Sequence, residues 1–240
     1  MATNEKKSIA KKLILIFGVI VGAVAISVTS ILATVAYLTS SAAVSNVFTI
    51  GKVGITMTES KVNPDGTLAD GGTTKVDTNT YHLVPNKTYV KDPTIKVDAG
   101  SENSFLFVLV RNDLENIECK NHTEHKTIAQ QLAANGWAKY TRASTGWVYV
   151  YVGAGNVPDG DASLATAGYT YAGAGETVAP GTYKLFDNFT IDSNANVDAY
   201  GAAKITLTAV AIQQSGFASL AEAWAAVIAT YPYIHTGNAS

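Results

Sequence analysis

The amino-acid sequence predicts a mainly β protein, an antiparallel β-sandwich with two or three short helices. Short runs rich in Val, Ile, Thr, Tyr and Phe recur along the chain, and turn-forming Gly, Pro, Asn and Asp residues separate them. Helical patterning is confined to two segments of the second half. The chain has 240 residues, of which 47% are hydrophobic, so it can bury a sizeable core.

The individual strands are predicted from their β-branched and aromatic content. We expect strands over Val47–Ile50, Val53–Thr58, Tyr81–Val84, Ile95–Val97, Ser104–Val110, Trp147–Val152, Tyr183–Ile191 and Ala203–Ile212. Ser104–Val110 is continuously apolar, which is typical of a strand covered on both faces. Ala203–Ile212 carries apolar side chains on both alternating faces, so we expect it to lie centrally in the sandwich.

Two helices are expected. In Thr127–Asn135, Ile128 and Leu132 lie four residues apart, and Gly136 is placed to end the helix. The second helix begins at Ser219, and Glu222 three residues later completes the pattern of a capping box. Pro232 is expected to end this helix. The Gly-rich stretch Gly153–Gly175 reads as a long surface excursion between strands.

The charges are unevenly distributed, and the N-terminus carries the anatomy of an export signal. Four lysines lie among the first twelve residues, and the 39 residues between Lys12 and Lys52 include no charge. Leu13–Ile26 is strongly apolar, and small residues gather before Tyr37. We therefore predict a signal peptide over residues 1–36, cut between Ala36 and Tyr37 or, alternatively, after Ala43. The open alternative is a retained membrane anchor, because Leu13–Ala36 is long enough to span a bilayer.

The composition excludes several classes of function. A net charge of −2 gives no electrostatic footprint for nucleic acid. Cys119 is the only cysteine, so no disulfide forms within the chain, and we interpret it as a half-buried small residue. A secreted protein of the extracellular matrix or cell surface is the expectation that agrees with the export signal.

A search for catalytic and metal-binding patterns yields two weak signals. His122 and His125 flank Thr-Glu, which has the residue types of a zinc-protease helix in the wrong order. Asp192–Asp198 alternates oxygen-bearing side chains as a calcium loop does, but Val197 stands where such a loop needs Gly. We interpret both as solvated polar segments. The sequence therefore predicts no catalytic residue, no metal site and no cofactor.

Several segments resemble the exported TasA/camelysin family. The resemblance is carried by Thr34–Thr39, by Asn46–Ile55 with Glu59, by Leu83–Pro85 with Lys91–Pro93, and by Ala209–Gln213 with Gly216–Phe217 and Ala223–Trp224. Asn86 replaces the Gly that the family has after Pro85, and Gly153–Gly175 has no counterpart. The resemblance thus touches both ends and the middle of the chain, and its most specific part is the junction between signal and first strand.

The resemblance implies a jelly-roll-like β-sandwich that is exported through a dedicated signal peptidase and assembles into extracellular fibres of a biofilm matrix. In such fibres the freed N-terminal segment adds a strand to the sheet of the neighbouring subunit, and this head-to-tail contact propagates as a filament. An accessory assembly protein is a possible further partner. Part of the family carries a peptidase label.

The uncharged segment Tyr37–Ile50 is the candidate donor, ahead of a sandwich domain over residues 51–240. Its predicted donor-strand residues alternate between two faces, with Tyr37, Thr39, Ser41 and Ala43 on one and Leu38, Ser40, Ala42 and Val44 on the other. We expect a structural fibre subunit and not an enzyme. The alternatives are a camelysin-like surface metalloprotease, a monomeric adhesion module, and, for the segment itself, a flexible stub left by cleavage.

Overall fold

A computed structural model describes residues 39–43, 46–48, 53–120, 123–158 and 175–236. The chain divides into two units, Met1–Leu38 and Thr39–Ser240, and every described residue belongs to the second. The signal peptide expected over residues 1–36 lies outside the described residues. The predicted end of the signal peptide at residue 36 and the predicted start of the sandwich domain at residue 51 remain predictions.

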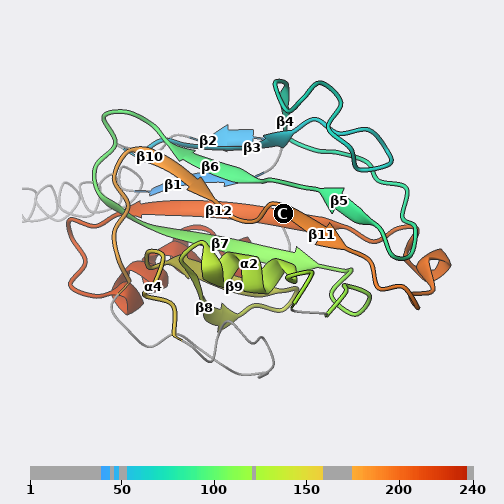
Figure 1. Ribbon diagram of the computed structural model, residues 1–240. Helices are drawn as coiled ribbons and strands as arrows, with labels where there is room; N and C mark the ends of the chain where they lie inside the picture. The colour runs from blue at the N-terminus through green and yellow to red at the C-terminus, as the bar shows by residue number, and fades with distance from the viewer. Residues whose placement is uncertain (1–38, 44–45, 49–52, 121–122, 159–174, 237–240) are drawn as a thin grey trace, which may run out of the picture. The chain divides into compact units, whose positions relative to one another are not determined.

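The described residues form a mainly β structure with antiparallel sheets (Figure 1). The largest sheet has six strands, in the order β2 (Asn46–Phe48), β1 (Thr39–Ala43), β12 (Ile205–Gln213), β7 (Ser104–Asn112), β9 (Trp147–Tyr151) and β8 (Trp137–Arg142). A second sheet has the order β10 (Gly181–Lys184), β6 (Thr94–Val97), β3 (Ile55–Ser60) and β4 (Lys75–Val76). A third pairs β11 (Asn188–Thr190) with β5 (Thr88–Val90).

The described helices are short. They are α2 (Ile128–Ala134), α4 (Leu220–Thr230), α5 (Tyr233–Thr236) and the 3-10 helix η1 (Val197–Tyr200). No helix among the described residues is long and apolar enough to cross a membrane.

Two hydrophobic cores lie on opposite faces of the six-stranded sheet. Alternate residues of β12 belong to different cores, because side chains of a strand point to opposite faces in turn. Leu207, Ala209 and Ala211 join the core shared with β3 and β6. Val210 and Ile212 join the core shared with α4. β12 is therefore buried on both faces, as its sequence pattern predicted.

The core between the sheets is built from the inward rows of β3, β6, β7 and β12, closed by α2 and by the segment that includes Phe186. It contains Ile55, Met57, Ile95, Val97, Leu106, Val108, Leu132, Trp137 and Phe186. Both main sheets contribute residues to this core, which is the packing of a β-sandwich.

The second core packs α4 against the other face of the six-stranded sheet. Trp224 of α4 lies 5.1 Å from Phe107 and 5.5 Å from Tyr140, measured between ring centroids. Phe107 is fully buried. Aromatic pairs at these separations add to the free energy of burial. α4 thereby covers a face that an antiparallel sheet otherwise exposes to water.

Most predicted strands are confirmed, and β7 is buried over Ser104–Val110 as its composition indicated. Two assignments were wrong. Tyr81–Val84 is an irregular segment, because its backbone bonds with side chains and turns: the Tyr89 hydroxyl accepts from the N–H of Val84 and donates to the carbonyl of His82. The expected strand Tyr183–Ile191 is two strands, β10 and β11, which pair with different partners.

Both predicted helices are confirmed, and Ser219 is the N-cap of α4 as expected, but the second half of the predicted capping box differs. Ser219 Oγ accepts from the N–H of Glu222, but the Glu222 carboxylate accepts from Ala218 and not from Ser219. A full capping box occurs instead at α2, between Thr127 and Gln130. Gly136 follows α2 with a φ of +89°, a conformation that favours glycine.

Candidate functional site

The described part of the predicted donor segment is a strand of the six-stranded sheet. β1 pairs with β12 in antiparallel register, from Thr39 opposite Ile212 to Ala43 opposite Thr208. Its other edge pairs with β2 from Ser41 to Ala43. Within Thr39–Ser240, this segment therefore completes the sheet of its own chain beside β12.

The composition of β1 explains how the strand can fit beside β12. Its residues are Thr39, Ser40, Ser41, Ala42 and Ala43, all small. Thr, Ser and Ala carry little apolar surface, and the hydrophobic contribution scales with apolar area. The structure gives the pairing of β1 as a backbone register, and backbone hydrogen bonds do not depend on which copy of the chain supplies the strand.

The remaining residues of the predicted processing and donor sites, Ala36, Tyr37, Leu38 and Val44, lie outside the described residues. So does His122, and of the two histidines that flank Thr-Glu only His125 is described. His125 lies three residues before α2, and its Nδ1 is 3.5 Å from Thr190 Oγ1. No group of three or more His, Cys, Asp or Glu side chains able to hold a metal ion occurs in the described part of the chain.

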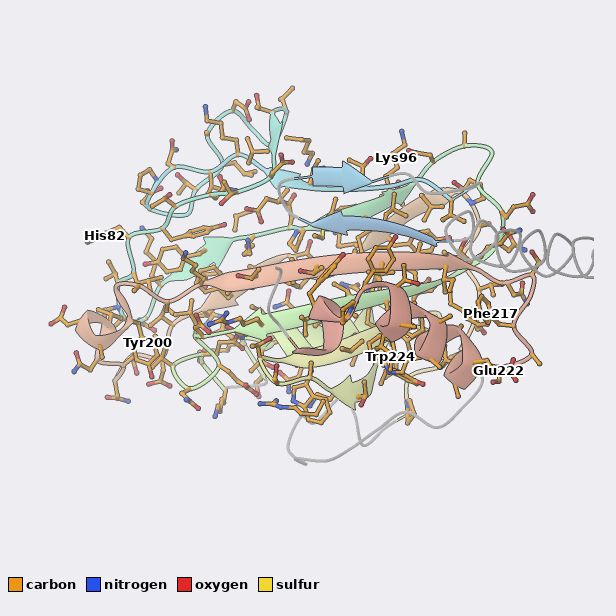
Figure 2. The ribbon with its side chains drawn as sticks, turned by 180° about the vertical axis from the view of Figure 1, so that it is seen from behind. His82, Lys96, Tyr200, Phe217, Glu222 and Trp224 are labelled. Atoms are coloured by element: carbon orange, nitrogen blue, oxygen red, sulfur yellow. The ribbon has the colours of Figure 1, made fainter. Side chains whose placement is uncertain are left out.

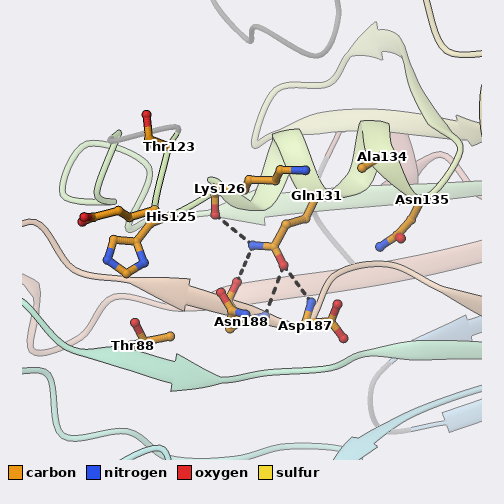
Figure 3. Close-up of a pocket in the computed structure, with 10 residues that line it drawn as sticks. Thr88, Thr123, His125, Lys126, Gln131, Ala134, Asn135, Asp187 and Asn188 are labelled. Atoms are coloured by element: carbon orange, nitrogen blue, oxygen red, sulfur yellow. Dashed lines mark hydrogen bonds between the residues drawn. The ribbon is translucent and has the colours of Figure 1, made fainter.

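His125 borders a polar cavity of about 620 Å³ beside α2 (Figure 3). Gln131 of α2 lies at its wall, and its amide bridges two chain segments. Nε2 donates to the carbonyls of Lys126 and Asn188, and Oε1 accepts from the N–H of Asp187 at 2.9 Å. The nitrogen and the oxygen of this amide are therefore both hydrogen-bonded to backbone groups, so the side chain has a structural role.

Glu118 is a buried carboxyl group close to this helix. It is 4% exposed, and it accepts hydrogen bonds from Asn112 Nδ2 at 2.6 Å and from the N–H of Ile128 at 3.2 Å. Burial raises the pKa of Glu118 to about 7, although both hydrogen bonds act in the opposite direction. The carboxyl group therefore joins the end of β7 to the start of α2.

The segment Asp192–Asp198 forms a polar turn. Asp192 Oδ1 accepts from the N–H of Asn194 at 2.8 Å, and η1 begins at Val197. Cys119, the lone cysteine, is partly buried, and its N–H donates to the carbonyl of Thr190.

Sequence reasoning missed one polar constellation, a buried ion pair between Glu59 and Lys91. Lys91 Nζ lies 2.6 Å from Glu59 Oε2, and the two side chains are 9% and 4% exposed. The available signal was alternation, because Glu59 continues the inward row of Ile55 and Met57 on β3. A charge in such a row marks either a satisfied pair or a site.

Comparisons of the chain with protein-family models, with curated proteins and with solved structures find no match.

Proposed function

We propose that this chain is a secreted structural subunit that polymerises into extracellular fibres of a biofilm matrix or cell surface, by donating its N-terminal strand to a neighbouring copy. In this proposal residues 1–36 are a signal peptide, and the remainder is a jelly-roll-like sandwich with its donor segment. A dedicated signal peptidase frees the donor. The partner is the chain itself, head to tail.

The observation that carries the proposal is the position of β1. It covers the edge of β12 from Thr208 to Ile212, so its departure exposes a row of backbone donors and acceptors. The same strand from a second copy restores the same pairs in the same register. Exchange of an identical element is a low-cost route to assembly, because the hydrogen bonds that form between two copies replace equivalent ones within each copy.

A reversible lock tests this exchange. We expect Ala43→Cys with Thr208→Cys to form a disulfide between β1 and its own β12, because residues opposite each other in an antiparallel pair have the required Cα separation. Cys119→Ser removes the competing thiol. The oxidised secreted protein should stay monomeric in electron micrographs and by size-exclusion chromatography, and reduction should restore filaments.

The matched control locks β12 to its other neighbour. Arg111 of β7 lies opposite Thr206, and both side chains are exposed. Arg111→Cys with Thr206→Cys in the same Cys119→Ser background should leave filament formation unchanged in either redox state. The proposal is wrong if the oxidised β1 lock forms filaments as well as the reduced protein, or if the unlocked secreted protein remains monomeric at every concentration.

A further inference from the structure

A second cavity, of about 980 Å³, opens beside the start of β12, whose residues Ile205, Thr206 and Leu207 line it. Its volume is within the range of small-molecule sites, which is about 300–1,000 Å³. The floor is apolar and includes Met57, Leu83, Leu114, Phe189 and Leu207. His82 and Tyr200 mark its rim, and Figure 2 shows both at the same end of the described structure.

The buried pair of Glu59 and Lys91 lies in the wall of this cavity. These two residues come from separate motifs, 32 positions apart. Glu59 Oε1 accepts from Asn79 Nδ2 at 2.9 Å, and this amide is anchored in turn by the N–H of Val62. The carboxylate is therefore held in a fixed orientation before any ligand arrives.

An aromatic ring completes the wall. Lys91 Nζ lies 5.9 Å from the centroid of the Tyr81 ring. The Tyr81 hydroxyl donates to the carbonyl of Val90 at 3.0 Å, and edge contacts with Tyr89 and Phe189 fix the ring. Burial and the negative charges of Glu59 and Asp92 raise the pKa of Tyr81 well above its ordinary value, so the hydroxyl remains a donor.

The pair has hydrogen-bonding capacity left for a ligand. An ammonium group has three N–H bonds, and Glu59 Oε2 is the one acceptor of Lys91 Nζ among the described residues. The Glu59 carboxylate has about four acceptor positions, of which Asn79 and Lys91 occupy two. A group that accepts from Lys91 and donates to Glu59 satisfies both.

The charges select against ionised ligands. Lys91 is neutralised by Glu59, and the rim carries two acidic residues, Asp77 and Asp198, against one lysine, Lys204. An anion meets net negative charge there. A purely apolar occupant leaves the remaining N–H bonds of Lys91 without water or partner, which is costly for a charged donor.

We infer that this cavity binds an uncharged saccharide, with neighbouring hydroxyl groups on Lys91 and Glu59 and the apolar face of the sugar ring against Tyr81. A hydroxyl both donates and accepts, as this pair requires. The C–H faces of a sugar ring match the aromatic and aliphatic lining. The inference is independent of fibre assembly, because every lining residue belongs to one copy of the chain.

Isothermal titration of the purified protein tests the site. The probes are neutral hexasaccharides of glucose, mannose and N-acetylglucosamine, with an alginate hexasaccharide as the acidic comparison and Nile red as the apolar one. We expect at least one neutral hexasaccharide to bind, and neither the alginate nor Nile red to compete with it.

Two variants and a control place the binding in this cavity. Glu59→Gln with Lys91→Met removes both charges together, which avoids leaving one of them buried alone. We expect it to weaken saccharide binding by about tenfold or more, because hydrogen bonds to charged groups are lost. Tyr200→Ala opens the rim without touching the ion pair and should also weaken binding. Lys96→Met should not, because this exposed lysine does not line the cavity and lies well away from His82 and Tyr200 in Figure 2.

Three results overturn the inference: no neutral hexasaccharide binds, the alginate or Nile red displaces the bound saccharide, or the double variant binds as well as the wild type. Circular dichroism checks that the double variant is folded. If it is not folded, Tyr200→Ala decides, and an unchanged dissociation constant in that variant rejects the site. Filament formation is scored separately in the same samples, so a failure of the saccharide site is distinct from a failure of assembly.

Discussion

The two neighbours of β12 differ in almost every physical respect. β7 pairs with it over nine positions and contributes large apolar residues. β1 pairs with it over five positions and contributes only Thr, Ser and Ala. On the β7 side, long backbone pairing is combined with buried apolar side chains, whereas on the β1 side the pairing is shorter and the residues are small. The difference identifies β1 as the neighbour that the proposed strand exchange would release.

The largest effect is expected on the β7 side. Phe107 is fully buried and packs against Trp224 and Tyr140. Phe107→Ala should lower the free energy of unfolding by about 3–5 kcal/mol, through lost burial and a cavity. Denaturant unfolding measures this loss. The control is Phe217→Ala, a partly exposed residue at the margin of the same core. Equal losses in the two variants contradict the assignment of β7 as the permanent neighbour.

The stability of the protein should depend on pH through Glu118, whose buried carboxyl group accepts a hydrogen bond from Asn112 at the end of β7. Its pKa in the folded protein, about 7, lies above its ordinary value of 4.5. The stabilising contribution is therefore complete below about pH 4.5 and is lost as the pH rises through about 7, by about 3 kcal/mol at most. Glu118→Gln should flatten this part of the stability profile.

The control for that experiment is Asp77→Asn, an exposed carboxylate that does not act on Glu118. Its profile, measured by denaturant unfolding between pH 4 and pH 8, should follow that of the wild type. If Glu118→Gln retains the full decline in stability, burial of this carboxyl group is not its cause.

A proline in β1 should lower the free energy of unfolding less than Phe107→Ala does, but it should strongly reduce filament assembly. Ala42 lies opposite Ala209 and Val47. Ala42→Pro should cost about 1–2 kcal/mol of unfolding free energy, because it removes one backbone donor and bends the strand. Ala42→Gly keeps the N–H and serves as the control. A loss as large as that of Phe107→Ala indicates that β1 is integral to the fold and argues against exchange.

The smallest effect is expected at the helix that covers β12. Ser219 Oγ accepts from the N–H of Glu222 at 3.2 Å, so Ser219→Ala should lower stability by about 1 kcal/mol. Thermal unfolding measures the shift, and Ser193→Ala in an exposed turn is the control. If the two serine variants unfold at the same temperature, the cap adds nothing to the packing of α4.

Local patterns predicted the fold where burial and propensity agree. β7, β9 and β12 are continuous β-branched and aromatic runs, and they form the centre of the six-stranded sheet. β8 was missed, because Lys139 and Arg142 interrupt its apolar pattern; both lie about 5 Å from the Trp147 ring. The predicted strand Tyr183–Ile191 is interrupted between β10 and β11, and its composition does not reveal this break, because the two strands pair with partners that are remote in sequence.

The sites were less predictable than the strands. The uncharged, small-residue character of the segment before residue 50 indicated a strand that pairs through its backbone, and β1 is a strand. The pairing of Glu59 with Lys91 could not be inferred, because nothing local to either residue specifies a partner 32 positions away. Tertiary folding alone brings Tyr81 and Tyr200 to the same cavity.

Because alternate side chains of β12 belong to different hydrophobic cores, the strand separates two compartments, one on each of its faces. A one-residue insertion ahead of Leu207 would move every following side chain into the opposite compartment at once. Alanines would then face the helix, and bulkier residues would face the second sheet. A substitution in this strand changes one side chain, whereas an insertion or deletion moves all the following side chains to the opposite face. Variants of this protein should therefore tolerate substitutions in β12 far better than a change in its length.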